Sequence, residues 1–267
     1  MISPILKHAI ESFEHGLEHY LDGTELSRKF AILHIDQSIE LFLKERIVNE
    51  GKSIHKSNGT TLSIHEAFNS LKSICDIVER PRLEELHHIR NTIQHRGFIP
   101  DIGTTKFYIQ IAYDFAKRFL SSELNINLLD VLPKQYQSLM EGKSALKETP
   151  KEIVQNLQDI KTSNDEPVNR ILSAYILLER TADALPPIMN KANRRILKAT
   201  IREAAMKNGH EKNDINKALN FIMAKRGEIV HKDGEPIEQT KKDAKRYVKI
   251  VEELINMTIG LDKEELN

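Results

Sequence analysis

The chain has 267 residues, of which 40% are hydrophobic and 29% are charged, and its formal net charge is zero. This composition is typical of a folded domain in water, and no apolar run approaches the eighteen or so residues that a membrane helix needs, so no membrane partner is expected. A zero net charge argues against a protein that coats nucleic acid through bulk positive charge. The single cysteine excludes an internal disulfide, and the N-terminus lacks signal-peptide features, so the expected location is the cytoplasm.

The first part of the chain predicts a series of amphipathic helices. Their expected starts are Ser3-Pro4, Thr24 as a cap, Ile64, Arg80-Pro81 and a point past Thr104 or Thr105. Glycines at 23, 51 and 97 are expected to end three of these helices, and the helix from Ile64 should run to Ile74. Residues 52–61 are polar and predict a loop.

Residues 124–167 are expected to link two domains, which span 1–123 and 168–267. Within the linker, Thr149-Pro150-Lys151-Glu152 is a capping box that predicts a helix over about 150–160. The second domain predicts helices over 171–185 and 193–207, a motif helix capped by Asp214, and a last helix over 237–259. No segment shows the alternation of a strand at length, so the predicted class is all-α, with two antiparallel helical bundles joined by a partly helical linker.

Two stretches place an arginine five residues before a histidine near the end of a helical segment. They read Arg90-Asn91-Thr-Ile-Gln-His95 and Arg226-Gly227-Glu-Ile-Val-His231. Arginine is a permanent, forked cation that suits phosphate, and histidine can carry or accept a proton near neutral pH. Residues four apart share a helix face, so Asn91 can support His95, whereas Gly227 offers no matching amide.

The two stretches belong to a longer repeat with an offset of 136 residues. A single Arg-x4-His spacing arises often by chance in a chain with 11 histidines, but here the apolar positions of the motif helix and of the next helix also coincide without a gap. The paired positions are Leu83 and Leu219, Leu86 and Ile222, Ile93 and Ile229, Ile111 and Tyr247, Ala112 and Val248, Phe115 and Val251, and Phe119 and Ile255. A duplicated two-helix unit explains this register.

The first motif resembles the signature of the HEPN superfamily, and His34-Ile-Asp-Gln-Ser-Ile-Glu-Leu-Phe-Leu-Lys44 is similar to the long helix that precedes this signature in many HEPN domains. The resemblance implies bundles that pair, within one chain or in a homodimer, so that two motifs form an RNA-cleaving cleft without a metal or other cofactor. The residues it implies as catalytic are Arg90, Asn91, His95, Arg226 and His231. It also implies a toxin or antiphage role, with an antitoxin or other regulatory protein as partner.

The residues themselves are consistent with that chemistry. Two histidines and two arginines supply a base, an acid and phosphate-binding charge for attack by the RNA 2′-hydroxyl. Between residues 190 and 232, Lys and Arg exceed Asp and Glu by seven, which is either a phosphate-facing surface or a solvated helix face. The basic residues expected to contact RNA are Arg96, Arg194, Arg195, Lys198, Lys225 and Lys232.

Two other functional interpretations of the sequence remain open. A non-catalytic RNA-binding or partner-binding module would keep the bundle and lose part of the motif, as Gly227 illustrates. A plain structural protein would use Arg90 and His95 as helix-end charges. His15 and His19 lie four apart as a possible metal pair, but no third ligand has a fitting spacing, so an exposed face is expected.

Overall fold

The computed structural model describes residues 2–141, 148–185, 195–230 and 241–260. These residues form helices and no strand, apart from an isolated β-bridge between His55 and Thr61, so the predicted all-α class is confirmed for them. None of the described helices is long and apolar enough to cross a membrane. The chain divides into two compact units, residues 1–146 and 147–267.

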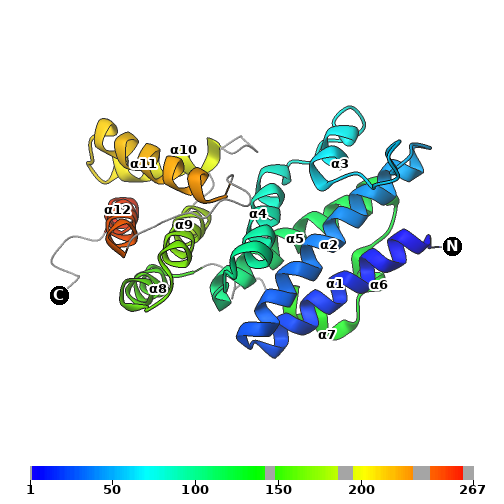
Figure 1. The fold of residues 1–267 in the computed structure, drawn as a ribbon, viewed down its shortest axis with the longest axis horizontal. Coiled ribbons are helices and arrows are strands. Elements are labelled where there is room, and N and C mark those ends of the chain that lie inside the picture. The colour runs from blue at the N-terminus through cyan, green and yellow to red at the C-terminus, as the bar shows by residue number, and fades with distance from the viewer. Residues whose placement is uncertain (1, 142–147, 186–194, 231–240, 261–267) are drawn as a thin grey trace. The chain divides into compact units, whose positions relative to one another are not determined.

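The first unit is built around one central helix. Its helices are α1 (Pro4–Asp22), α2 (Glu25–Asn49), α3 (Ile64–Leu71), α4 (Arg80–Arg96), α5 (Ile102–Leu124), α6 (Leu128–Val131) and α7 (Lys134–Glu141) (Figure 1). Helix α2 contacts α1, α3, α4 and α5. Its neighbouring residues Ile35 and Asp36 are therefore both buried, although they point in different directions. The polar side chain of Asp36 therefore lies inside the bundle rather than on its surface.

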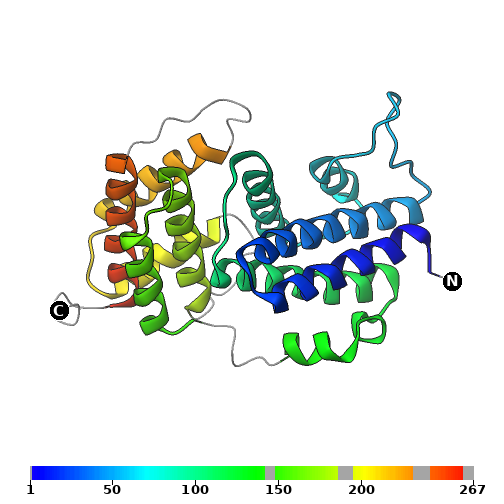
Figure 2. The ribbon, with the colours of Figure 1, turned by 60° about the horizontal axis from the view of Figure 1, so that its bottom comes forward.

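Helices α1 and α2 run side by side along most of their length (Figure 2). The predicted caps are confirmed, because the Ser3 and Thr24 hydroxyls accept hydrogen bonds from the first turns of α1 and α2. A Cβ atom at Gly16 would lie 2.6 Å from Cγ1 of Ile35, which is closer than any real contact. Glycine at this position is what allows the two helices to approach so closely.

Three local predictions in the first unit need correction. Helix α3 ends at Leu71, before the expected Ile74. Helix α5 is capped by Asp101, whose carboxylate accepts from the Thr104 amide at 2.7 Å, so Thr104 and Thr105 lie inside the helix. The region predicted as a linker also contributes α6 and α7 to the first unit. Leu128 and Met140 of these helices are buried, which gives both helices a packing role.

The second unit consists of α8 (Pro150–Thr162), α9 (Pro167–Ala184), α10 (Arg195–Lys207), α11 (Lys212–Val230) and α12 (Lys241–Ile259). Helix α9 contacts the other four. The capping box at Thr149 and Glu152 is confirmed, and both of its hydrogen bonds form. Asp214 was expected to cap α11, but the helix already begins at Lys212, so Asp214 lies within its first turn. The segment that follows α11 lies outside the described residues.

The positions paired by the 136-residue offset are buried in both units. Leu86 of α4 and Ile222 of α11 are examples from the motif helices, and Phe115 of α5 and Val251 of α12 are examples from the helices that follow. Phe115 also stacks on Phe119, with 4.9 Å between ring centroids. The apolar stripe of α5 is thus core, as predicted from its spacing.

Candidate functional site

Helix α4 carries the first motif, with Arg90 at the edge of its buried stripe and His95 on its exposed side. Pro81 lies in the first turn of this helix, and Gly97 ends it in the left-handed conformation with φ 65°. Leu83 and Leu86 are buried against the bundle, while Arg90 and His95 keep partial or full exposure. The packing of the apolar face therefore fixes which side of α4 presents the polar residues.

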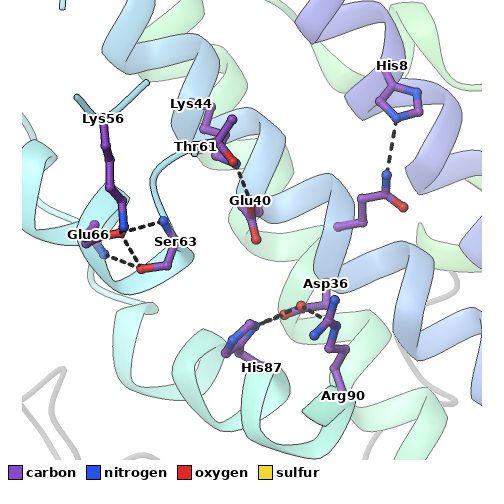
Figure 3. A network of polar contacts seen from close by, with 11 residues as sticks. His8, Asp36, Glu40, Lys44, Lys56, Thr61, Ser63, Glu66, His87 and Arg90 are labelled. Atoms are coloured by element: carbon purple, nitrogen blue, oxygen red, sulfur yellow. Dashed lines mark hydrogen bonds and ion pairs between the residues drawn. The ribbon is translucent and has the colours of Figure 1, made fainter. Parts of the chain in front are cut away.

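A buried carboxylate of α2 lies beneath this polar face (Figure 3). The Asp36 side chain is only 2% exposed. Its Oδ2 atom lies 2.9 Å from Nδ1 of His87 and 3.6 Å from Nε of Arg90. A buried carboxylate is stable when it is paired and hydrogen-bonded, and these two α4 side chains supply both interactions. Asp36 thereby fixes the positions of His87 and Arg90 relative to each other.

Arg90 is held on two sides and still reaches solvent. Its Nη1 donates a hydrogen bond to Oδ1 of Asn91 at 2.9 Å, and its Nε faces Asp36. One third of its side chain is exposed, at 33%. A guanidinium has five donors, so these two contacts leave donor capacity for a phosphate or another carboxylate. Asn91 acts here on the arginine, a role that the sequence spacing alone did not reveal.

His95 lies one turn beyond Asn91 and is exposed. His87, Asn91 and His95 follow one another at four-residue intervals, which places them in one row along the helix surface. Arg90 flanks that row. The first unit thus brings together the predicted Arg90, Asn91 and His95, and adds Asp36 and His87, which had not been singled out.

Further histidines lie near the start of this row. The ring of His65 on α3 lies 5.9 Å from that of His87 and 6.1 Å from that of His88, measured between centroids. Nδ1 of His65 is also 3.5 Å from Oε1 of Glu84. These contacts come from α3 and α4 together, so the polar face of α4 continues onto a neighbouring helix.

The arginine of the second motif has a different environment. Arg226 is 5% exposed, and its guanidinium lies over the ring of Tyr175, 5.3 Å from the centroid. Burial lowers the pKa of Arg226 to about 10, and the interaction with Tyr247 opposes that shift. The side chain therefore remains a cation at neutral pH. His231, its predicted partner, lies outside the described residues.

The residues predicted to contact RNA are only partly described. Arg194 and Lys232 lie outside the described residues, and Arg195 begins α10. Arg96 is the last residue of α4. Lys198 donates to Oδ1 of Asn220 at 3.3 Å, and Lys225 forms an ion pair with Glu228 at 3.0 Å. The Lys225 charge is therefore partly compensated, which weakens its expected contribution to RNA binding.

The histidine pair of α1 gains a third member through packing. His34 of α2 stacks on His19 at 5.5 Å between centroids and meets His15 edge-on at 5.6 Å. An exposed face was expected for both α1 histidines; His15 is exposed, but His19 is half-buried because it stacks on His34. Burial, followed by the neighbouring His19 and His15, lowers the pKa of His34. Among the described residues, no group of three or more His, Cys, Asp or Glu side chains is arranged to hold a metal ion.

No protein-family model, curated protein or solved structure matches this chain. The resemblance to HEPN domains therefore depends on the motif residues and the helical pattern.

Proposed function

We propose that the protein is a HEPN-type endoribonuclease whose site is built from Arg90, Asn91 and His95, with Arg226 and His231 as its second half. The observation that carries this proposal is the arrangement around Arg90. A guanidinium held by Asp36 and Asn91, with a third of its side chain exposed, is positioned to bind phosphate beside a row that contains two histidines.

The proposed reaction uses the nucleophile that RNA itself carries. A base removes the proton of the 2′-hydroxyl, the 2′-oxygen attacks the phosphorus, and an acid protonates the leaving 5′-oxygen. Arginine stabilises the charge that develops on the non-bridging oxygens. Histidine and arginine side chains can perform every step of this reaction without a metal, and DNA is inert because it lacks the 2′-hydroxyl.

The second motif is proposed to complete the cleft. A lone Arg-x4-His motif offers one histidine, whereas the reaction needs both a base and an acid. We propose that His231 joins His95 within one chain. The alternative is a homodimer in which His95 pairs with the His95 of a second copy. By analogy with HEPN ribonucleases, the activity would serve as a toxin or in defence against phage, under the control of an antitoxin or another regulatory protein.

The test is cleavage of labelled single-stranded RNA by purified full-length protein in excess EDTA. Cleavage that continues in chelator is the expected result. A complete dependence on added Mg²⁺ would overturn the metal-independent mechanism. A single-stranded DNA of the same sequence serves as the matched control and should stay intact.

A second candidate function is a non-catalytic module that binds RNA or a protein partner. Two features of α11 favour it: Arg226 is buried over Tyr175, and Gly227 stands where the first motif has an asparagine. If this candidate is correct, the protein binds the same RNAs in a gel-shift or fluorescence assay and leaves them uncut. Cleavage at turnover rates that exceed those of a His95→Ala variant excludes it.

A further inference from the structure

His87 belongs to neither Arg-x4-His motif, but it has the contacts of a proton-transfer group. It lies three residues before Arg90 on α4, and its side chain is 15% exposed. Nδ1 lies 2.9 Å from Oδ2 and 3.2 Å from Oδ1 of the buried Asp36 carboxylate.

The Asp36 contact determines which ring nitrogen carries hydrogen. An ionised carboxylate only accepts hydrogen bonds, so Nδ1 of His87 must be the donor. Neutral His87 then presents the lone pair of Nε2 on the other side of the ring. A carboxylate that fixes the tautomer and orientation of an imidazole in this way is a recurrent device for preparing a general base.

The position of His87 also suits the site. On an ideal helix His87 and Arg90 differ by about 60° in azimuth and about 4.5 Å in rise, and Arg90 lies between His87 and His95 along the axis. A phosphate bound to the Arg90 guanidinium therefore has one histidine before it and one after it along the axis, with His87 about 60° and His95 about 140° around the helix from Arg90. The buried Asp36 carboxylate contacts both His87 and Arg90. It therefore fixes the distance between the His87 ring and a phosphate bound to Arg90.

We propose that His87 is the general base of this site, an inference that rests on the proposed ribonuclease function. Nε2 of His87 takes the proton of the 2′-hydroxyl while the 2′-oxygen forms its bond to phosphorus. The bond from phosphorus to the 5′-oxygen breaks, and a motif histidine gives that oxygen a proton. The products are a 2′,3′-cyclic phosphate and a 5′-hydroxyl, and Asp36 is a positioning residue.

The experiment compares the wild-type protein, His87→Gln and a matched control, His55→Gln, which replaces an exposed histidine of the loop before α3. Single-turnover cleavage of labelled single-stranded RNA is measured in EDTA from pH 5 to pH 9. We expect His87→Gln to lose on the order of 100-fold or more in rate, because that is the usual contribution of a general base. The rise in rate with pH on the acidic side should also vanish, while His55→Gln behaves as wild type.

Binding and folding are measured beside the rates. Affinity for a 2′-O-methyl RNA, which cannot be cleaved, should change by less than about threefold in His87→Gln, because a base acts in the transition state rather than in binding. If His87→Gln fails to fold, the nitrogen-15 spectrum of the wild-type histidine rings decides. Nε2 of His87 should shift when the 2′-O-methyl RNA is added, and an unchanged resonance would overturn the proposal.

The outcomes test the ribonuclease function and the role of His87 separately. Cleavage by wild type and by His87→Gln at similar rates, with the same acidic limb, overturns the role of His87 and leaves the ribonuclease function standing. Failure of the wild-type protein to cut any RNA overturns the ribonuclease function and the role of His87 with it. The groups that contact His87, and therefore shape the pH profile, are Asp36 on α2 and His65 on α3. Arg90 contacts the same Asp36 oxygen, and Glu84 contacts His65.

Discussion

The buried carboxylate of Asp36 and the imidazole of His87 form a hydrogen bond of 2.9 Å across α2 and α4. They are 51 positions apart in the chain, so the pair exists only when the bundle is folded. The same Oδ2 atom lies 3.6 Å from Nε of Arg90. One acidic side chain therefore links the packing of the first unit to the geometry of its candidate site.

Replacing Asp36 with asparagine should impair cleavage more than folding. An asparagine can donate to Nδ1 of His87, which favours the tautomer that no longer presents Nε2 as acceptor, and the rate should fall about 100-fold or more. Glu40→Gln is the matched control, because Glu40 lies one turn further along α2 and pairs with Lys44. Single-turnover rates and melting curves of both variants provide the check. Equal rates for the two would show that Asp36 has no part in positioning the site.

Substitutions of core residues and of site residues should have different effects on the free energy of unfolding. Phe115 is fully buried and stacked on Phe119, so Phe115→Ala should cost about 3–5 kcal/mol of unfolding free energy. His95 is exposed, so His95→Ala should leave the denaturant midpoint nearly unchanged while cleavage is lost. Urea unfolding followed by circular dichroism gives both values. A large drop in the stability of His95→Ala would show that His95 has a structural role instead.

Much of the helical framework could be predicted because its signals are local. The caps at Ser3, Thr24 and Thr149 and the stop at Gly97 depend on residues within one turn of a helix end, and all four are confirmed. The error at the start of α5 arose where two local signals competed. Asp101, rather than Thr104 or Thr105, caps α5, because a carboxylate three residues before an amide is placed well enough to accept its hydrogen bond.

The candidate site was only half visible in the sequence. Arg90, Asn91 and His95 stand out because they lie within six residues of one another. The part that Asp36 plays in the site depends on contacts between helices, which no spacing within one helix reveals. The same is true of His34 in the histidine group of α1 and α2. The sequence does contain an indication of His87, because His87, Asn91 and His95 are spaced four residues apart and therefore share a helix face.

The stability of the first unit should depend on pH through His34. Burial, with the nearby His19 and His15, lowers the pKa of His34 from its ordinary value of 6.5. Below that value the unfolded chain binds a proton that the folded chain does not, so stability is lost as the pH falls through 6.5 toward the folded pKa. His34→Gln should weaken this pH dependence. Urea midpoints at several pH values between 7.5 and 5 test the point, and an identical slope in the variant would contradict it.

Substitution of His231 distinguishes a composite cleft from two separate ones. If His95 and His231 act as a unit within one chain, each single alanine variant should lose nearly as much activity as the double variant. If instead the chain forms homodimers that pair identical motifs, His231→Ala keeps much of its activity. Single-turnover rates, read together with the oligomeric state from light scattering, decide between the two arrangements.

The most direct test of attack by the 2′-hydroxyl is removal of that group at the point of cleavage. Once a cut site has been mapped on a single-stranded RNA, the same RNA is made with one 2′-deoxy nucleotide on the 5′ side of the scissile phosphate and incubated with the protein in EDTA. Cleavage at that site should disappear, while other sites are still cut to give 2′,3′-cyclic phosphate and 5′-hydroxyl ends. Continued cleavage at the 2′-deoxy position, or products with 3′-hydroxyl ends, would contradict the mechanism.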